Sequence, residues 1–266
     1  MRGLIAFLLA STLALASGGA AAGCSRNLTV AASPVGRGLM ISDNGQVSGS
    51  IRDFLDVISS RTGCSFEYVS VPRARAWAML ETNGVDLIPA ATQSPARDQH
   101  ARFIRTHTVN TMIAGFDQRV ARINALDDIL KARLQIGVVR GYQFGAAYDE
   151  LIVKLERAGL MHKVPDPETL VRLLASGRVN ATIVPLTAIC DAVEKAGMAP
   201  ALLTSELPEL PKMEIGIYLS TRRLRVGELE ALEQAIRAAV AKGDYALHMR
   251  RSYPAWSLRG VGRHWE

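Results

Sequence analysis

The residues best placed for chemistry form the segment Thr92-Gln93-Ser94-Pro95-Ala96-Arg97, which follows the strand-like apolar run 85–90. Open α/β sheets bind their ligands just beyond the carboxyl ends of the strands. A second segment, Arg140-Gly141-Tyr142, lies between a strand-like run and a helical stripe. Backbone N–H groups at such a helix start can hold an anion. The two segments are therefore candidates for ligand binding, and the second is a candidate for binding an anion.

Motifs for catalysis and for metal binding are missing from the sequence. It contains no His-Glu-x-x-His, Cys-x-x-Cys, Walker loop, Gly-x-Ser-x-Gly or Gly-x-Gly-x-x-Gly. The five histidines lack the spacing of metal ligands. We therefore expect a binding protein and not an enzyme, with no metal and no cofactor.

The elements that must position these residues alternate between strand and helix. Leu28–Ala32, Phe66–Val71 and Val85–Ala90 are strand-like, and helices are expected between them, the first capped by Ser50 and ended by Gly63. Such alternation predicts an α/β fold whose sheets are mostly parallel and flanked by helices.

The same order recurs downstream and predicts a second lobe. The β-rich run Val109–Phe116 would carry the chain into it, and Met213–Leu219 would carry the chain back, so two crossing segments form a hinge. We expect the first lobe over residues 23–112, the second over 113–212, and a return to the first lobe with closing helices over 213–266.

Residues 1–22 have the pattern of a secretory signal. Arg2 precedes an apolar run of 13 residues, and Ala20-Ala21-Ala22 supplies a cleavage pattern. We therefore expect export to the periplasm, where a disulfide is the default state of cysteines.

Three cysteines are present. Cys24 precedes the first strand, and Cys64 precedes the strand expected beside it, so we pair these two cysteines. Lipidation of Cys24 is the second alternative. Cys190, in an apolar helical stretch, is expected to be a buried free thiol.

Composition sets broad limits. The 266 residues are 48% hydrophobic and carry a net charge of +6, which fits a folded protein of one large domain or two lobes. The basic residues are spread along the chain and only 6% of residues are aromatic, so we expect no nucleic-acid partner. We expect a monomer.

One family shares these features in this order. The run from Arg61-Thr62-Gly63 through Gly84-Val85-Asp86-Leu87-Ile88 to Ser94-Pro95-Ala96-Arg97 and Phe103 resembles the bacterial extracellular solute-binding proteins of family 3. These are receptors of polar amino acid ABC importers. The resemblance implies a two-lobed periplasmic binding protein fold of type II, a small-molecule ligand between the lobes, and an inner-membrane ABC permease as partner.

The resemblance also implies site residues. The arginine at the Arg97 position grips the ligand carboxylate, which suits a planar fork with two parallel donors. Ser33 would lie in the loop after the first strand, Arg73 at the start of the second helix, and Ala91 and Thr92 on the cleft edge. The alternatives are that Arg97 pairs with Asp98 on the surface and that Arg73 is a solvated helix start. For Trp77, we expect core packing.

The sequence departs from the family pattern at Pro185. Amino acid binders usually carry an Asp there, which neutralises the ligand ammonium, and proline has no charge to offer. An unpaired buried ammonium is costly, so we expect a carboxylate or other anion that lacks an ammonium group. The alternatives are a periplasmic enzyme of the same fold, similar to cyclohexadienyl dehydratases, and a sensory module without transport.

Overall fold

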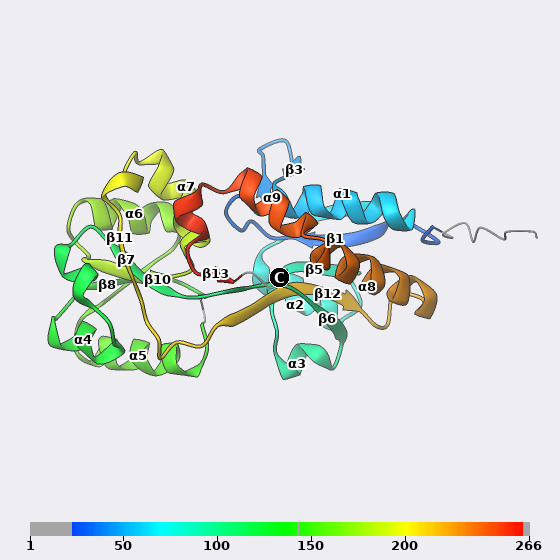
Figure 1. Ribbon diagram of the computed structural model, residues 1–266. Coiled ribbons are helices and arrows are strands. Elements are labelled where there is room, and N and C mark those ends of the chain that lie inside the picture. Colours follow the sequence, from blue (N-terminus) through cyan, green and yellow to red (C-terminus); the bar gives the residue numbers. More distant parts are fainter. Residues whose placement is uncertain (1–22, 143, 263–266) are drawn as a thin grey trace, which may run out of the picture.

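The computed structural model describes residues 23–142 and 144–262, which form two α/β lobes, each built on a mixed sheet (Figure 1). The predicted signal segment lies outside the described residues. None of the described helices is long and apolar enough to cross a membrane.

The first lobe contains a six-stranded sheet in the order β13-β6-β12-β5-β1-β4. Its strands are β1 (Leu28–Ala32), β4 (Phe66–Ser70), β5 (Leu87–Thr92), β6 (Ala101–Val109), β12 (Met213–Ser220) and β13 (Val261–Gly262). Its helices are α1 (Ser50–Thr62), α2 (Arg73–Glu81), α3 (Pro95–Asp98), α8 (Val226–Ala241) and α9 (Asp244–Ser252). A small hairpin pairs β2 (Met40–Ile41) with β3 (Val47–Ser48), and a 3₁₀ turn covers Ala255–Leu258.

The second lobe contains a five-stranded sheet in the order β11-β7-β10-β8-β9. Its strands are β7 (Met112–Gly115), β8 (Ile136–Val139), β9 (Met161–Val164), β10 (Ala181–Val184) and β11 (Leu203–Glu206). Its helices are α4 (Leu126–Lys131), α5 (Ala146–Arg157), α6 (Pro167–Ala175) and α7 (Leu186–Lys195), with 3₁₀ turns at Gln118–Arg122 and Ala199–Ala201.

The alternation of strands and helices is confirmed, but the prediction of mostly parallel sheets is wrong. β1 runs parallel to β4 and β5, as the sequence predicted. The strands at the crossings reverse this direction, because β12 is antiparallel to both β5 and β6, and β7 is antiparallel to β10 and β11. The run 109–116 is not one strand: β6 ends at Val109 in the first sheet and β7 begins at Met112 in the second.

Helix α1 shows why local patterns gave the helix but not its cap. Its predicted apolar face is buried, at Ile51, Phe54, Leu55 and Ile58. The residue at the N-cap is Gly49 and not Ser50, whose hydroxyl instead lies 3.6 Å from the Met249 sulfur. Gly49 has a φ of 111°, and a Cβ there would lie 2.6 Å from the Arg37 carbonyl oxygen. Only glycine combines a readily accessible positive φ with the absence of a Cβ that would clash with this oxygen.

The cysteine predictions are confirmed. Cys24 and Cys64 form a disulfide that ties the start of the described chain to the end of α1. Cys190 is a free, buried thiol on α7.

A buried ionic cluster lies in the first lobe, next to the starts of β1 and β5 and the end of β12. The Asp86 carboxylate is fully buried and accepts two hydrogen bonds of 2.6 Å from Arg26 and one of 2.8 Å from Arg223. Burial would raise the pKa of Asp86, but the hydrogen bonds from the two arginines outweigh it and hold the pKa below its usual range. The charge is therefore satisfied by protein groups and does not require a ligand.

Candidate ligand-binding site

A cavity of about 170 Å³ lies between the two lobes. The first lobe contributes Thr92, His107 and Ile215 from three neighbouring strands, and the second contributes the loop with Tyr142 and Phe144 and the start of α7. Most of the lining is apolar or aromatic, and no Asp or Glu is among its described residues. Such a site fits a small solute with an apolar body.

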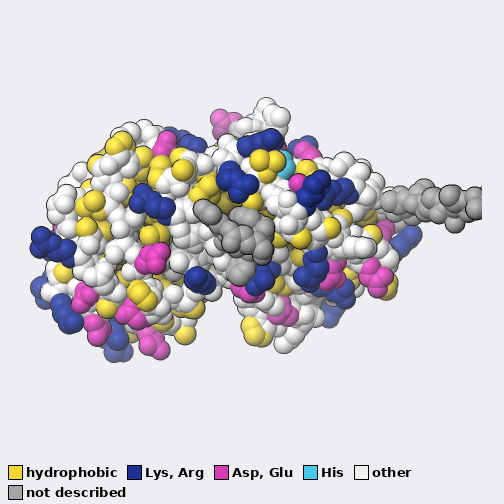
Figure 2. Space-filling view, in the orientation of Figure 1, with side chains coloured by type: hydrophobic (Ala, Val, Ile, Leu, Met, Phe, Trp, Pro, Cys, Tyr) yellow, Lys and Arg dark blue, Asp and Glu magenta, His cyan; other side chains and the backbone are white. Residues whose placement is uncertain are grey.

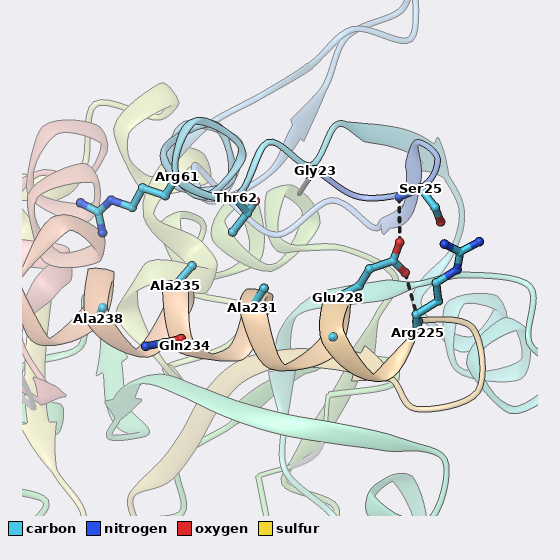
Figure 3. A pocket seen from close by; sticks show the side chains of 11 residues that line it. Gly23, Ser25, Arg61, Thr62, Arg225, Glu228, Ala231, Gln234, Ala235 and Ala238 are labelled. Atoms are coloured by element: carbon cyan, nitrogen blue, oxygen red, sulfur yellow. Dashed lines mark hydrogen bonds between the residues drawn. The ribbon is translucent and has the colours of Figure 1, made fainter. Parts of the chain in front are cut away.

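A larger hollow of about 760 Å³ lies elsewhere, at the far end of the first lobe (Figure 3). It is an open groove between α1 and α8, whose face here is formed by Ala231, Ala235 and Ala238. Its one carboxylate, Glu228, already accepts hydrogen bonds from the backbone N–H groups of Ser25 and Arg225. The groove belongs to one lobe only, so the cavity between the lobes is the better candidate.

Arg97, on α3, lies beside the cavity between the lobes. Its Nη1 donates to the Thr92 carbonyl oxygen at 2.8 Å and to the Thr92 hydroxyl at 3.1 Å, and Thr92 lines the cavity. Its guanidinium carbon lies 3.7 Å from the centre of the Trp77 ring, a cation–π contact. The alternative partner Asp98 instead accepts a hydrogen bond from the Tyr218 hydroxyl at 2.7 Å. Among the described residues, Arg97 has no ion-pair partner.

Arg73, at the start of α2, brings a second cation to the same place. Its Nη1 donates to the Pro89 carbonyl oxygen at 3.0 Å, and no described carboxylate lies within ion-pair distance. Burial and the charge of Arg97 lower its pKa to about 10, an effect that Tyr142 of the second lobe partly opposes. Two neighbouring guanidinium groups without acids are electrostatically unfavourable until an anion binds.

Trp77 was expected in the core and is only half-buried. Its edge packs against Tyr218 at a ring distance of 6.0 Å, and its face supports Arg97. The sequence pattern identified the packing role but not the contact with the cation. That contact joins residues of two different helices, α2 and α3, which helical spacing within one segment does not report.

The structure brings only some of the predicted residues together. Thr92 and Tyr142 line the cavity, with Arg73 and Arg97 beside them. Ala91 is buried on the opposite face of β5, because successive side chains of a strand point to opposite faces. The Ser33 hydroxyl is buried and donates to the Val71 carbonyl oxygen at 2.8 Å, so its proton is not available to a ligand.

Arg140 and Gly141 are exposed and lie apart from the cavity. They line a separate hollow of about 320 Å³ on the second lobe, which Tyr142 also borders. The Arg140 N–H donates to the Val164 carbonyl oxygen and the Tyr142 N–H to that of Val139, so both are occupied. Helix α5 begins only at Ala146. The anion site predicted at residues 140–142 therefore stays a prediction, with no free backbone donors at these two positions to support it.

Two features of the cavity bear on specificity. Pro185, where the sequence resemblance leads us to expect an Asp in amino acid binders, lines the cavity at the start of α7. His107 also lines it and was not singled out by the sequence; the alternation of His107 and Val109 on β6 was the signal that could have found it.

Polar contacts join the lobes next to the cavity. Arg37 Nε, in the first lobe, lies 2.6 Å from the Asp191 carboxylate on α7. Trp256 Nε1 donates to Glu194, also on α7, at 2.7 Å.

The Lys and Arg side chains on the face shown in Figure 2 are scattered over both lobes and do not gather into a patch.

The sequence matches the profile of bacterial extracellular solute-binding proteins, family 3, over residues 28–252. No curated protein matches the sequence. Several solved structures have the same fold at low identity. An ancestral cationic amino acid solute-binding protein has a TM-score of 0.67 at 16% identity, covering 86% of this chain and 96% of that one. The amino acid ABC transporter substrate-binding protein AbpA from Streptococcus pneumoniae, bound to L-arginine, has 0.65 at 18% identity, covering 87% and 95%.

A histidine kinase sensor domain with similarity to periplasmic binding proteins has a TM-score of 0.65 at 15% identity and covers 86% of this chain and 98% of that one. At these identities the likeness to solved structures shows the fold, and the profile match over most of the chain shows the family. The two lobes, the cavity between them and this match lead to one conclusion: the chain belongs to the bacterial extracellular solute-binding proteins, family 3.

Proposed function

We propose that this protein captures a small carboxylate without an ammonium group between its lobes and delivers it to an ABC importer. The observation that carries the proposal is the pair Arg73 and Arg97, which have no described acid partner and lie beside a cavity without a described carboxylate. A ligand carboxylate would neutralise this pair. A ligand ammonium would find no counter-charge in the described lining.

Of the similar structures, AbpA is bound to L-arginine and the ancestral protein is described as a cationic amino acid solute-binding protein. Acids neutralise a cationic side chain in a binding site, and the described lining of this cavity contains none. Pro185 in place of an acid supports the same conclusion. We therefore expect the solute of this protein to differ in charge from the solutes of those neighbours.

Binding would act through closure of the lobes. An anion that contacts Arg97 in the first lobe and Tyr142 in the second favours the closed state over the open one. The contacts of Arg37 and Trp256 with α7 would add to the stability of that state. Dehydratase activity is less well supported, because cyclohexadienyl dehydratases use an acidic residue in the cleft and no described carboxylate faces this cavity.

The test is a thermal-shift screen of matched compounds: carboxylates, the corresponding amines, and the corresponding α-amino acids. A ligand at a hundred times its Kd stabilises the folded state by about 2.7 kcal/mol, which raises the melting temperature measurably. We expect shifts with carboxylates and none with amines. Shifts with α-amino acids alone would refute the proposal.

Two variants locate the site. Arg97→Ala should weaken binding of the best carboxylate by about 2–5 kcal/mol, because a buried anion loses its charged partner. Arg75→Ala is the matched control, since Arg75 lies on α2 as Arg73 does but is exposed. Equal affinities of the two variants would exclude Arg97 from the site. Delivery is tested separately, by uptake of the radiolabelled solute in cells with and without the gene.

A further inference from the structure

His107 is a buried histidine in the wall of the cavity that the proposed anion site does not use. It lies on β6, and only 5% of its surface is exposed. Its ring stacks on Tyr245 of α9 at 5.1 Å with an interplanar angle of 25°. This packing fixes the plane of the ring.

The protonation of the ring follows from its neighbours. The Thr106 hydroxyl donates its single proton to the Ile215 carbonyl oxygen, at 3.1 Å. The same hydroxyl oxygen lies 3.0 Å from His107 Nδ1. We assign the hydroxyl proton to the bond with Ile215, and the oxygen then accepts from an Nδ1–H group. Burial lowers the pKa of His107 to about 4, so the ring is neutral at pH 7. With this assignment the proton of the neutral ring is on Nδ1, and Nε2 carries a lone pair.

No described residue donates a hydrogen bond to Nε2. Nε2 is also not among the fully buried polar atoms that lack a partner, so it remains accessible. Since the ring lines the cavity, Nε2 can accept a hydrogen bond from a bound molecule. A buried acceptor that stays unpaired is unfavourable, so a ligand with a suitably placed donor binds more tightly than one without.

The sheet register places this acceptor relative to the cations. Ile215 is paired with Thr92 on one side and with His107 on the other, so the three residues lie side by side across β5, β12 and β6. Neighbouring strands are about 4.8 Å apart, which puts Thr92 and His107 roughly 10 Å apart at the backbone. Arg97 donates a hydrogen bond to Thr92. Arg97 and the acceptor Nε2 of His107 are therefore on opposite sides of the cavity.

We propose that His107 is a specificity-determining residue, whose Nε2 accepts a hydrogen bond from a donor group at the end of the solute opposite its carboxylate. The inference rests on the proposed function and deepens it. It assigns the solute to a class: an apolar body with a carboxylate at one end and a hydroxyl or N–H group at the other. A carboxylate would not bind at Nε2, because two acceptors would face each other.

The tautomer is tested first, without any ligand. Long-range ¹H–¹⁵N spectra of the protein labelled in its histidines should show His107 neutral at pH 7, with Nδ1 protonated and Nε2 unprotonated. The signals are assigned by comparison with His107→Gln. A ring protonated on Nε2, or charged at pH 7, would overturn the proposal.

The ligand class is tested with two matched pairs, 4-hydroxyphenylacetate against phenylacetate and 6-hydroxyhexanoate against hexanoate, by calorimetry. We expect one hydroxylated member to bind roughly 10- to 100-fold more tightly than its partner. His107→Phe should remove this preference, and His107→Gln, which keeps an acceptor, should retain part of it. The Gln variant controls for loss of folding in the Phe variant.

The outcomes separate this inference from the proposed function. Carboxylates that bind equally well with and without the hydroxyl would overturn the role of His107 and leave the anion site standing. If 4-methylphenol binds as tightly as 4-hydroxyphenylacetate, and His107→Phe weakens both, the carboxylate proposal fails and the role of His107 stands. If none of the four carboxylates binds, both are refuted.

Discussion

Replacing Arg73 with Met should stabilise the ligand-free protein while weakening its binding of anions. The guanidinium is half-buried and lies close to Arg97; its described partners are the Pro89 carbonyl oxygen and the Trp77 ring, whose centre is 6.0 Å away. Burial and Arg97 lower its pKa from an ordinary value of about 12.5 to about 10. Because the folded state has the lower pKa, the charged group costs stability at every pH below about 10.

The size of the effect follows from these contacts. At about 1.4 kcal/mol per pKa unit, holding the charge costs about 3 kcal/mol. Loss of the hydrogen bond to Pro89 offsets about 1 kcal/mol of the gain. Met keeps the apolar stem, so we expect the free energy of unfolding to rise by about 2 kcal/mol.

Urea denaturation at pH 7 measures this change. Arg73→Lys keeps the positive charge and should show less of the gain. Arg75→Met removes an exposed charge from the same helix and should change stability by less than about 0.5 kcal/mol. Calorimetry with the best carboxylate should show weaker binding for Arg73→Met only. A destabilised Arg73→Met protein with unchanged affinity would refute the conclusion that Arg73 is an unpaired cation waiting for an anion.

Three further changes test other parts of the structure. Replacing Cys24 and Cys64 with Ser opens a loop of about 40 residues and should cost about 4 kcal/mol in urea denaturation; an unchanged midpoint would contradict a stabilising disulfide. Asp86→Asn should cost about 3 kcal/mol at pH 7, because two arginines lose a buried partner. Since the pKa of Asp86 is lowered on folding, its contribution is present above about pH 4 and lost as the pH falls further, so the variant should show a smaller acid-induced loss than the wild type. Arg37→Ala removes the ion pair with Asp191 across the lobes and should weaken ligand binding several-fold by calorimetry; tighter binding would show that the pair does not favour closure.

The sequence predicted most of the fold, because its elements are determined by local spacing. The buried face of α1 and the parallel pairing of β1 with β4 could be inferred from apolar periodicity and element order. The antiparallel strands could not, since β12 pairs with β6 across more than a hundred residues of sequence. Local patterns carry no information about such distant partners.

The candidate site was predictable where a residue lies at the end of a strand or the start of a helix: Thr92 ends β5, and Arg73 begins α2. Its remaining parts depend on tertiary register. Trp77 of α2 contacts Arg97 of α3 through the tertiary structure, and His107 faces the cavity because its strand pairs in one register with β12. A shift of one residue would turn His107 to the opposite face of the sheet.

The most direct test of the account is a crystal structure with the tightest-binding carboxylate from the thermal-shift screen. We predict that the ligand lies between the lobes, with its carboxylate within hydrogen-bond distance of Arg97 and close to Arg73. A carboxylate bound on the second lobe away from both arginines, or a ligand held outside the cavity, would contradict the account.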